Sequence, residues 1–108
     1  MKLSKVLFVF LFLSQASFAD GPERFEISIS KNRVSPADTV VSSKNSIELI
    51  VHNKGKSQAV FRSGSLNREV IIAPNQSASI SLGTLRSGAY YFSGEFKSGS
   101  AQGRILVK

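Results

Sequence analysis

The side chains that could do chemistry in this 108-residue sequence are few, because it contains one histidine, seven carboxylates and no cysteine. His52 is the only imidazole, and a single imidazole without partners binds a metal weakly. A surface or half-buried histidine is the alternative to a metal ligand. The absence of cysteine removes thiolate catalysis, iron–sulfur clusters and cysteine-type zinc sites. With one histidine, we expect neither a paired-histidine metal site nor a serine–histidine–aspartate triad, and therefore no enzyme.

The elements that must position these groups follow from a period of two in the hydrophobic pattern. Apolar residues alternate with polar ones most clearly over residues 25–29 and 47–52, which is typical of strands with one buried face. Further strands are expected at 39–41, 59–61, 69–72, 77–82, 89–93 and 103–107, which makes about eight, with residues 94–102 as a loop. Tyr90 and Phe92 should face the core, and Tyr91 the solvent. The pattern predicts one all-β, two-sheet antiparallel sandwich.

The first 19 residues have the layout of a secretory signal peptide. Lys2 and Lys5 precede an unbroken apolar run (6–13), and residues 17–19 place serine and alanine at the −3 and −1 positions of a cleavage site. The run is much shorter than the roughly 20 residues of a membrane span; an uncleaved anchor is the alternative. We predict cleavage after Ala19, no transmembrane segment in the mature domain (20–108), and a periplasmic or secreted location.

The charge of the chain is positive but dispersed. Without Lys2 and Lys5, 12 basic residues face 7 acidic ones, for a net charge of +5. Because no block of five or six like charges occurs, we expect a solvated basic surface and no nucleic-acid partner. Attraction to anionic lipid headgroups or to an acidic partner is a weaker alternative.

Several blocks of the sequence carry a resemblance to a known family. The segments 34–36 (VSP), 47–53 (IELIVHN), 88–92 (GAYYF) and 105–108 (ILVK) occur in an order that resembles the cupredoxin fold. More narrowly, the Leu-Asn-Arg-Glu block at 66–69 and the Glu-Phe…Ala-Gln-Gly blocks at 95–103 are similar to the small EfeO-type cupredoxin-like domains of bacterial iron-uptake systems. The resemblance implies a Greek-key β-sandwich that accompanies an iron permease.

The resemblance also shows where copper ligands would stand. A type 1 copper site uses two histidines, a cysteine thiolate and a weak axial methionine. The cysteine position falls near Gly94 and one histidine position on Lys97, while Met1 is the only methionine. Residue type therefore excludes a type 1 copper centre.

Two carboxylates remain as hard ligands for a weakly bound iron or copper ion, namely Glu69 and Glu95, with His52 as a third candidate. Arg62, Arg68 and Lys97 stand beside these carboxylates, so ion pairing is the alternative that we favour.

The function implied by the resemblance is an accessory or binding module of metal uptake, most simply of iron. Its partner would be an iron permease or another uptake component, met through the loop face 63–69 and 95–101. The docking residues would be Arg62, Asn67, Arg68, Phe96 and Lys97. The rival hypothesis is an exported β-sandwich with an interaction or structural role and no part in metal chemistry.

Overall fold

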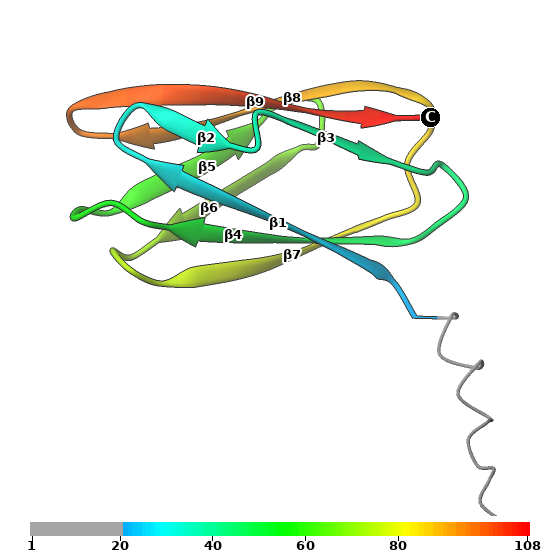
Figure 1. Cartoon of the computed structure of the whole chain (residues 1–108), viewed down its shortest axis with the longest axis horizontal. Helices are drawn as coiled ribbons and strands as arrows, with labels where there is room; N and C mark the ends of the chain where they lie inside the picture. Colours follow the sequence, from blue (N-terminus) through cyan, green and yellow to red (C-terminus); the bar gives the residue numbers. More distant parts are fainter. Residues whose placement is uncertain (1–20) are drawn as a thin grey trace, which may run out of the picture.

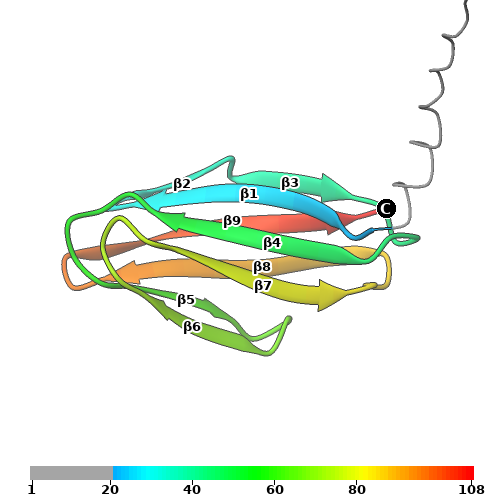
Figure 2. The ribbon, with the colours of Figure 1, turned by 90° about the horizontal axis from the view of Figure 1, so that it is seen from below.

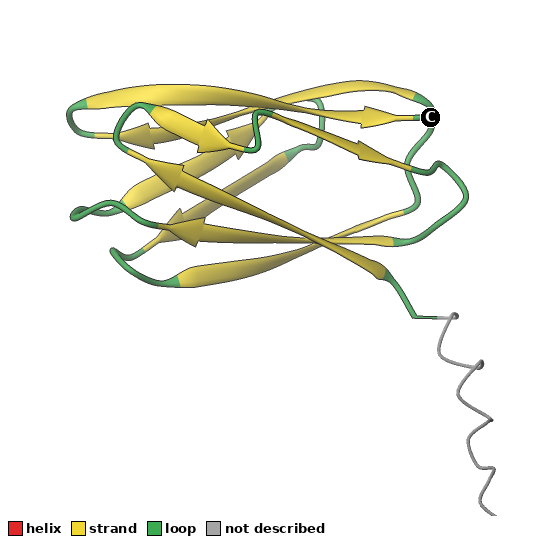
Figure 3. Ribbon diagram, viewed as in Figure 1, coloured by secondary structure: helices red, strands yellow, loops and turns green. Residues whose placement is uncertain are grey.

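The computed structural model describes residues 21–108, so the predicted signal peptide and its cleavage site lie outside the described residues. All regular elements in this part of the chain are strands (Figures 1 and 3). No helix between residues 21 and 108 is long and apolar enough to cross a membrane. The strands are β1 (Glu23–Ser30), β2 (Arg33–Ser35), β3 (Asp38–Val41), β4 (Ile47–Asn53), β5 (Ala59–Ser63), β6 (Arg68–Ile72), β7 (Ser77–Gly83), β8 (Gly88–Phe96) and β9 (Gly99–Val107).

The strands form two sheets, as the alternating pattern predicted. One sheet has the order β2-β1-β4-β7 and the other the order β3-β9-β8-β5-β6, so that β6 forms an edge (Figure 2). The purely antiparallel pairing that we expected is wrong at two places, because β1 runs parallel to β4 and β3 runs parallel to β9. The chain crosses to the other sheet for β3 and returns for β4, and such crossings are characteristic of Greek-key sandwiches.

The core lies between the sheets and is built from the apolar positions of the alternating strands. Ile27 and Leu49 of the four-stranded sheet are essentially inaccessible, as is Phe61 of the five-stranded sheet. The rings of Phe61 and Phe92 pack with their centroids 5.1 Å apart. Glycine at position 103 leaves room for the Phe92 ring, because a Cβ atom there would lie 2.4 Å from Cζ of Phe92. The predicted inward orientation of Phe92 and outward orientation of Tyr91 are confirmed.

The predicted loop over residues 94–102 is wrong. β8 continues to Phe96 and β9 begins at Gly99, which leaves a two-residue hairpin turn between paired strands. Gly94 is buried against Ile29, whose Cγ2 atom would lie 3.0 Å from a Cβ at position 94. Gly94, which indicates a loop in the sequence, therefore serves close packing inside a strand. β2, only three residues long, was also missed.

The last residue of β4, Asn53, joins two connections at one end of the sandwich. Its side chain is buried, and its Nδ2 atom donates to the carbonyl oxygens of Ser57 (2.9 Å), Ile72 (3.0 Å) and Ala73 (3.2 Å). Its Oδ1 atom accepts from the backbone N–H of Gly55 (2.8 Å). The backbone of Asn53 also bonds to the β6–β7 turn, at Asn75 and Gln76. One buried amide thus satisfies polar groups of the β4–β5 loop and of the end of β6.

We expect Asn53→Ala to destabilise the fold by about 2–4 kcal/mol, because it leaves buried carbonyl and N–H groups without partners. Asn53→Asp should be similarly destabilising, since a carboxylate cannot donate to the three carbonyls. Urea unfolding measures both effects. Asn45→Ala is the matched control, because the Asn45 amide bonds only the exposed Glu23 carboxylate. A loss for Asn53→Ala no larger than that of the control would contradict the prediction.

Candidate functional site

The two carboxylates predicted as metal ligands meet at one guanidinium group. Arg62 lies on β5, directly opposite Glu69 of β6, while β8 runs along its other side. Its Nη2 atom is 2.6 Å from Oε2 of Glu69, and its Nη1 atom is 2.7 Å from Oε1 of Glu95. Glu95 also accepts a hydrogen bond from Ser93. The two carboxylates raise the pKa of Arg62, chiefly through the hydrogen bond from Arg62 to Glu69. Ion pairing, the alternative that the sequence favoured, is confirmed for Arg62, whereas Arg68 and Lys97 form no ion pair with these two carboxylates in the described chain.

The three predicted metal ligands do not come together in one site. Glu69 and Glu95 lie on the five-stranded sheet with a positive charge between them, whereas His52 lies on β4 in the other sheet. Among residues 21–108, no group of three His, Cys, Asp or Glu side chains is placed to hold a metal ion. The donor set does not fit a type 1 copper centre either, since the sequence has no cysteine and its only methionine is Met1.

His52 nevertheless has two polar partners that the sequence analysis missed. Its Nε2 atom lies 2.8 Å from Oε1 of Glu26 on β1, and its Nδ1 atom is hydrogen-bonded to Oγ of Ser77 on β7. The prediction from the sequence concerned only a serine–histidine–aspartate triad, and these contacts form a serine–histidine–glutamate arrangement that it did not anticipate. Five cavities at the surface of residues 21–108 are lined by other residues, and none of these five is lined by Glu26, His52 or Ser77. The arrangement cross-links three neighbouring strands on the outer side of the four-stranded sheet.

The predicted docking residues fall into two groups at opposite ends of β5. Asn67 and Arg68 belong to the β5–β6 connection, where the Arg68 guanidinium donates to the carbonyl oxygen of Ser81 (3.0 Å) and ties β6 to β7. Phe96 and Lys97 lie at the β8–β9 hairpin, at the other end of β5. Arg62, the fifth predicted docking residue, lies on β5. Its ion pairs with Glu69 of β6 and Glu95 of β8 connect the strands that carry the two groups.

A feature that the sequence analysis missed is the apolar character of the outer side of the five-stranded sheet, called the outer face below. Tyr91 is 54% exposed, as predicted, and Val40 (54%) and Ile71 (64%) are the other exposed large hydrophobic residues in the described chain. The pairings of β5 with β6 and β8, and of β9 with β3 and β8, place all three on this one face. The sequence contained one signal for this face: side chains alternate between the two sides of a strand, so Val40 in β3 and Ile71 in β6 point away from the buried neighbours Val41 and Ile72.

The same face carries a second arginine pair. Arg104 lies opposite both Tyr91 and Asp38 in the strand pairing, and its Nη2 atom is 2.8 Å from Oδ2 of Asp38. This hydrogen bond lowers the pKa of Asp38 and raises that of Arg104. A shallow cavity of about 350 Å³ lies beside these three side chains. The outer face thus combines exposed apolar groups with two fixed guanidinium groups.

Comparison with known proteins places this architecture in a family. The model of the cupredoxin-like domain matches residues 3–107. The chain belongs to the cupredoxin-like domain family. It is 35% identical over 82 residues to "Uncharacterized protein RP394" of Rickettsia prowazekii (strain Madrid E), an alignment that covers 76% of this chain and 66% of that protein. The chain therefore spans just under two thirds of this relative's length.

Solved cupredoxin-like structures agree with the fold. The metal-binding domain of the Cu(I)-exporting P-type ATPase CopA of Streptococcus pneumoniae D39 gives a TM-score of 0.69 at 18% identity, over 82% of this chain and 88% of that chain. Auracyanin A, a blue copper protein of Chloroflexus aurantiacus, gives 0.64 at 12% identity, over 82% of this chain and 100% of that chain. At such identities the likeness concerns the fold alone, and the cupredoxin part of the resemblance is confirmed.

We expect Arg62→Gln to strengthen metal binding, because it removes the positive charge held between Glu69 and Glu95. Calorimetric titration with Mn(II) and Fe(III) should show tighter binding than in the wild type. Arg104→Gln is the matched control, since it removes an equivalent charge elsewhere on the outer face and should leave binding unchanged. Micromolar binding by the wild type that is lost in Glu95→Ala would contradict the argument, because it would show that a metal competes successfully with Arg62.

A second prediction concerns Glu48, whose pKa is lowered because Ser79, and after it Arg24, donate hydrogen bonds to the ionised carboxylate. A lowered pKa means that this stabilisation is present above the unfolded pKa, about 4.3, and is lost as the pH falls through the folded value. Glu48→Gln should therefore have a lower Tm than the wild type at pH 6, and the difference should be smaller at pH 3, which lies below the unfolded pKa. Thermal unfolding at both pH values provides the measurement, and an equal difference at both would contradict the prediction.

Proposed function

We propose that this protein is an exported cupredoxin-like binding module that docks onto a protein partner through its outer face and works without a type 1 copper centre. One observation carries the proposal: the exposed large hydrophobic residues of the described chain share that face with two ion-paired arginines. Residues of these types, an aromatic ring and arginines, are enriched at the energetic centres of protein interfaces.

The face suits docking because it is rigid before a partner arrives. Its side chains stand on paired strands, and Arg62 and Arg104 are each held by carboxylates within hydrogen-bonding distance. Little side-chain freedom is therefore lost on binding, which lowers the entropic cost of association. The guanidinium groups also keep unused N–H donors, since each has five.

The resemblance to EfeO-type domains supports a partner in bacterial metal uptake, an iron permease or another uptake component outside the cytoplasm. Two structural neighbours, the Cu(I)-bearing domain of CopA and the blue copper protein auracyanin A, also belong to metal chemistry by name. Docking agrees better with this chain than capture of a metal at Glu69 and Glu95, because Arg62 engages both carboxylates.

A complementation assay tests the proposal. In a strain that lacks the gene, we expect uptake of radioactive iron to fall, and the wild-type gene should restore it. Ile71→Ser/Tyr91→Ser should restore little uptake, because it removes apolar contacts from the outer face. Ile50→Ser is the matched control, since Ile50 is half-exposed on the outer side of the other sheet, and it should restore uptake fully.

Two outcomes would contradict the proposal. Normal iron uptake in the deletion strain would remove the link to uptake and favour the rival hypothesis of an interaction module without a role in metal transport. Full restoration by Ile71→Ser/Tyr91→Ser would show that the partner does not use the outer face. Thermal unfolding of the variants, which should melt within a few degrees of the wild type, excludes misfolding as the cause of a lost function.

A further inference from the structure

One end of the sandwich gathers four lysines with no carboxylate among them, and we call it the lysine end. The β1–β2, β4–β5, β6–β7 and β8–β9 connections meet there, at the left of Figure 1. Three of these connections supply the exposed side chains of Lys31, Lys54, Lys56 and Lys97. The ion pairs within residues 21–108 use arginines and His52, and none of them uses a lysine. None of these four ammonium groups is therefore neutralised by an ion pair in the described chain.

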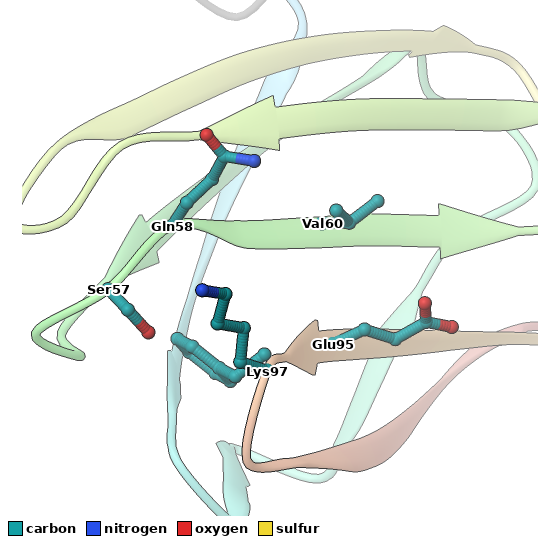
Figure 4. A pocket seen from close by; sticks show the side chains of 6 residues that line it. Ser57, Gln58, Val60, Glu95 and Lys97 are labelled. Carbon is teal, nitrogen blue, oxygen red and sulfur yellow. The ribbon is translucent and has the colours of Figure 1, made fainter.

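Two cavities open between these loops, and Phe96 lines both of them. The first, of about 500 Å³, is lined by three of the lysines together with serine hydroxyl groups; its polar side chains are Ser30, Lys31, Lys54, Lys56, Ser57 and Ser98. The second, of about 480 Å³, includes Lys97 and Gln58 (Figure 4). The only carboxylate in either lining is Glu95, which points away from Lys97 and is bound by Arg62. Both linings therefore present hydrogen-bond donors and positive charge.

The loops that carry the lysines are fixed by contacts with one another. The backbone N–H of Lys54 donates to the carbonyl oxygen of Ile29 (2.8 Å), which ties the β4–β5 loop to β1. Gly55 packs against the ring of Phe96, where a Cβ atom would lie 2.7 Å from Cε2, and its N–H group is held by Asn53. The lysine end is thus a set of cations on a fixed backbone, and binding there does not require the backbone to become ordered.

We propose that the lysine end binds a phosphate-bearing anion. Each ammonium group supplies three donors and no acceptor, and lysine is a well-established phosphate ligand. Cavities of this size accept small ligands, and the serine hydroxyls can donate to further phosphate oxygens. A free phosphate compound and a phospholipid headgroup present the same chemistry to this site. The same charges repel a metal cation. The lysine end therefore differs from the carboxylates of the outer face, Glu69 and Glu95, in the kind of ligand that it can bind.

Inorganic pyrophosphate is the first probe, titrated into the protein produced from the full-length sequence while backbone amide resonances are followed by NMR. Shifts should concentrate at Lys31, Ser98 and residues 54–57. Raising NaCl from about 50 to about 500 mM should weaken binding roughly tenfold or more, because salt screens exposed charges. Vesicles of phosphatidylcholine with and without phosphatidylglycerol, in a co-sedimentation assay, test the lipid source.

Two double variants separate the site from the net charge. Lys54→Gln/Lys56→Gln should weaken binding of the probe at least about tenfold, which corresponds to 1.4 kcal/mol or more. Lys44→Gln/Lys108→Gln removes the same charge at the opposite end of the sandwich and should change binding less than about twofold. Ile71→Ser/Tyr91→Ser should bind the probe like the wild type, so failure of the outer-face proposal leaves this one intact.

Each result decides the proposal. Binding of pyrophosphate, or binding of anionic vesicles alone, that is lost in Lys54→Gln/Lys56→Gln supports it and identifies the source of the phosphate. Equal weakening by the two double variants would overturn it, because net charge would then explain the attraction. Binding of neither probe at low salt would overturn it as well.

Discussion

The buried amide of Asn53 is the interaction on which one end of this molecule depends. It closes β4, fixes the turn at Gly55 and Ser57, and satisfies the carbonyl groups where β6 ends. A buried amide can do this because it offers donors and an acceptor at one point, where an apolar side chain would leave several backbone groups unpaired. The chain has no disulfide to do the same work, since it contains no cysteine.

The two kinds of basic side chain are used differently in this fold. Three of the six arginines in residues 21–108 are engaged in ion pairs, and Arg62 spans two carboxylates because its planar fork presents donors in two directions. Lysines take no part in the ion pairs within residues 21–108, and four of the six in this part of the chain gather at the lysine end. The outer face is consequently close to neutral and partly apolar, whereas the lysine end is positive. Two surfaces with such different chemistry suit two different classes of partner.

Membership of the cupredoxin-like domain family explains the architecture but not the chemistry. The sandwich depends on the alternating core residues, and it forms here without the cysteine that a type 1 copper centre requires. Family likeness predicted the Greek-key sandwich correctly, and residue types alone excluded the thiolate–methionine copper site. The loop at 94–102 was mispredicted because glycine has two uses, in turns and in close packing, and only the neighbours of Gly94 and Gly103 distinguish them.

The sequence by itself predicted most of the strands, the orientation of Phe92 and Tyr91, and the lack of the cysteine that a type 1 copper centre requires, because these follow from residue type and from a period of two along the chain. Only the tertiary structure decided which side chains meet. Arg62 reaches Glu95 across 33 residues, and His52 reaches Glu26 and Ser77 across 26 and 25 residues. Such contacts depend on strand order and register, which are set by packing of the whole core, and local sequence does not encode them.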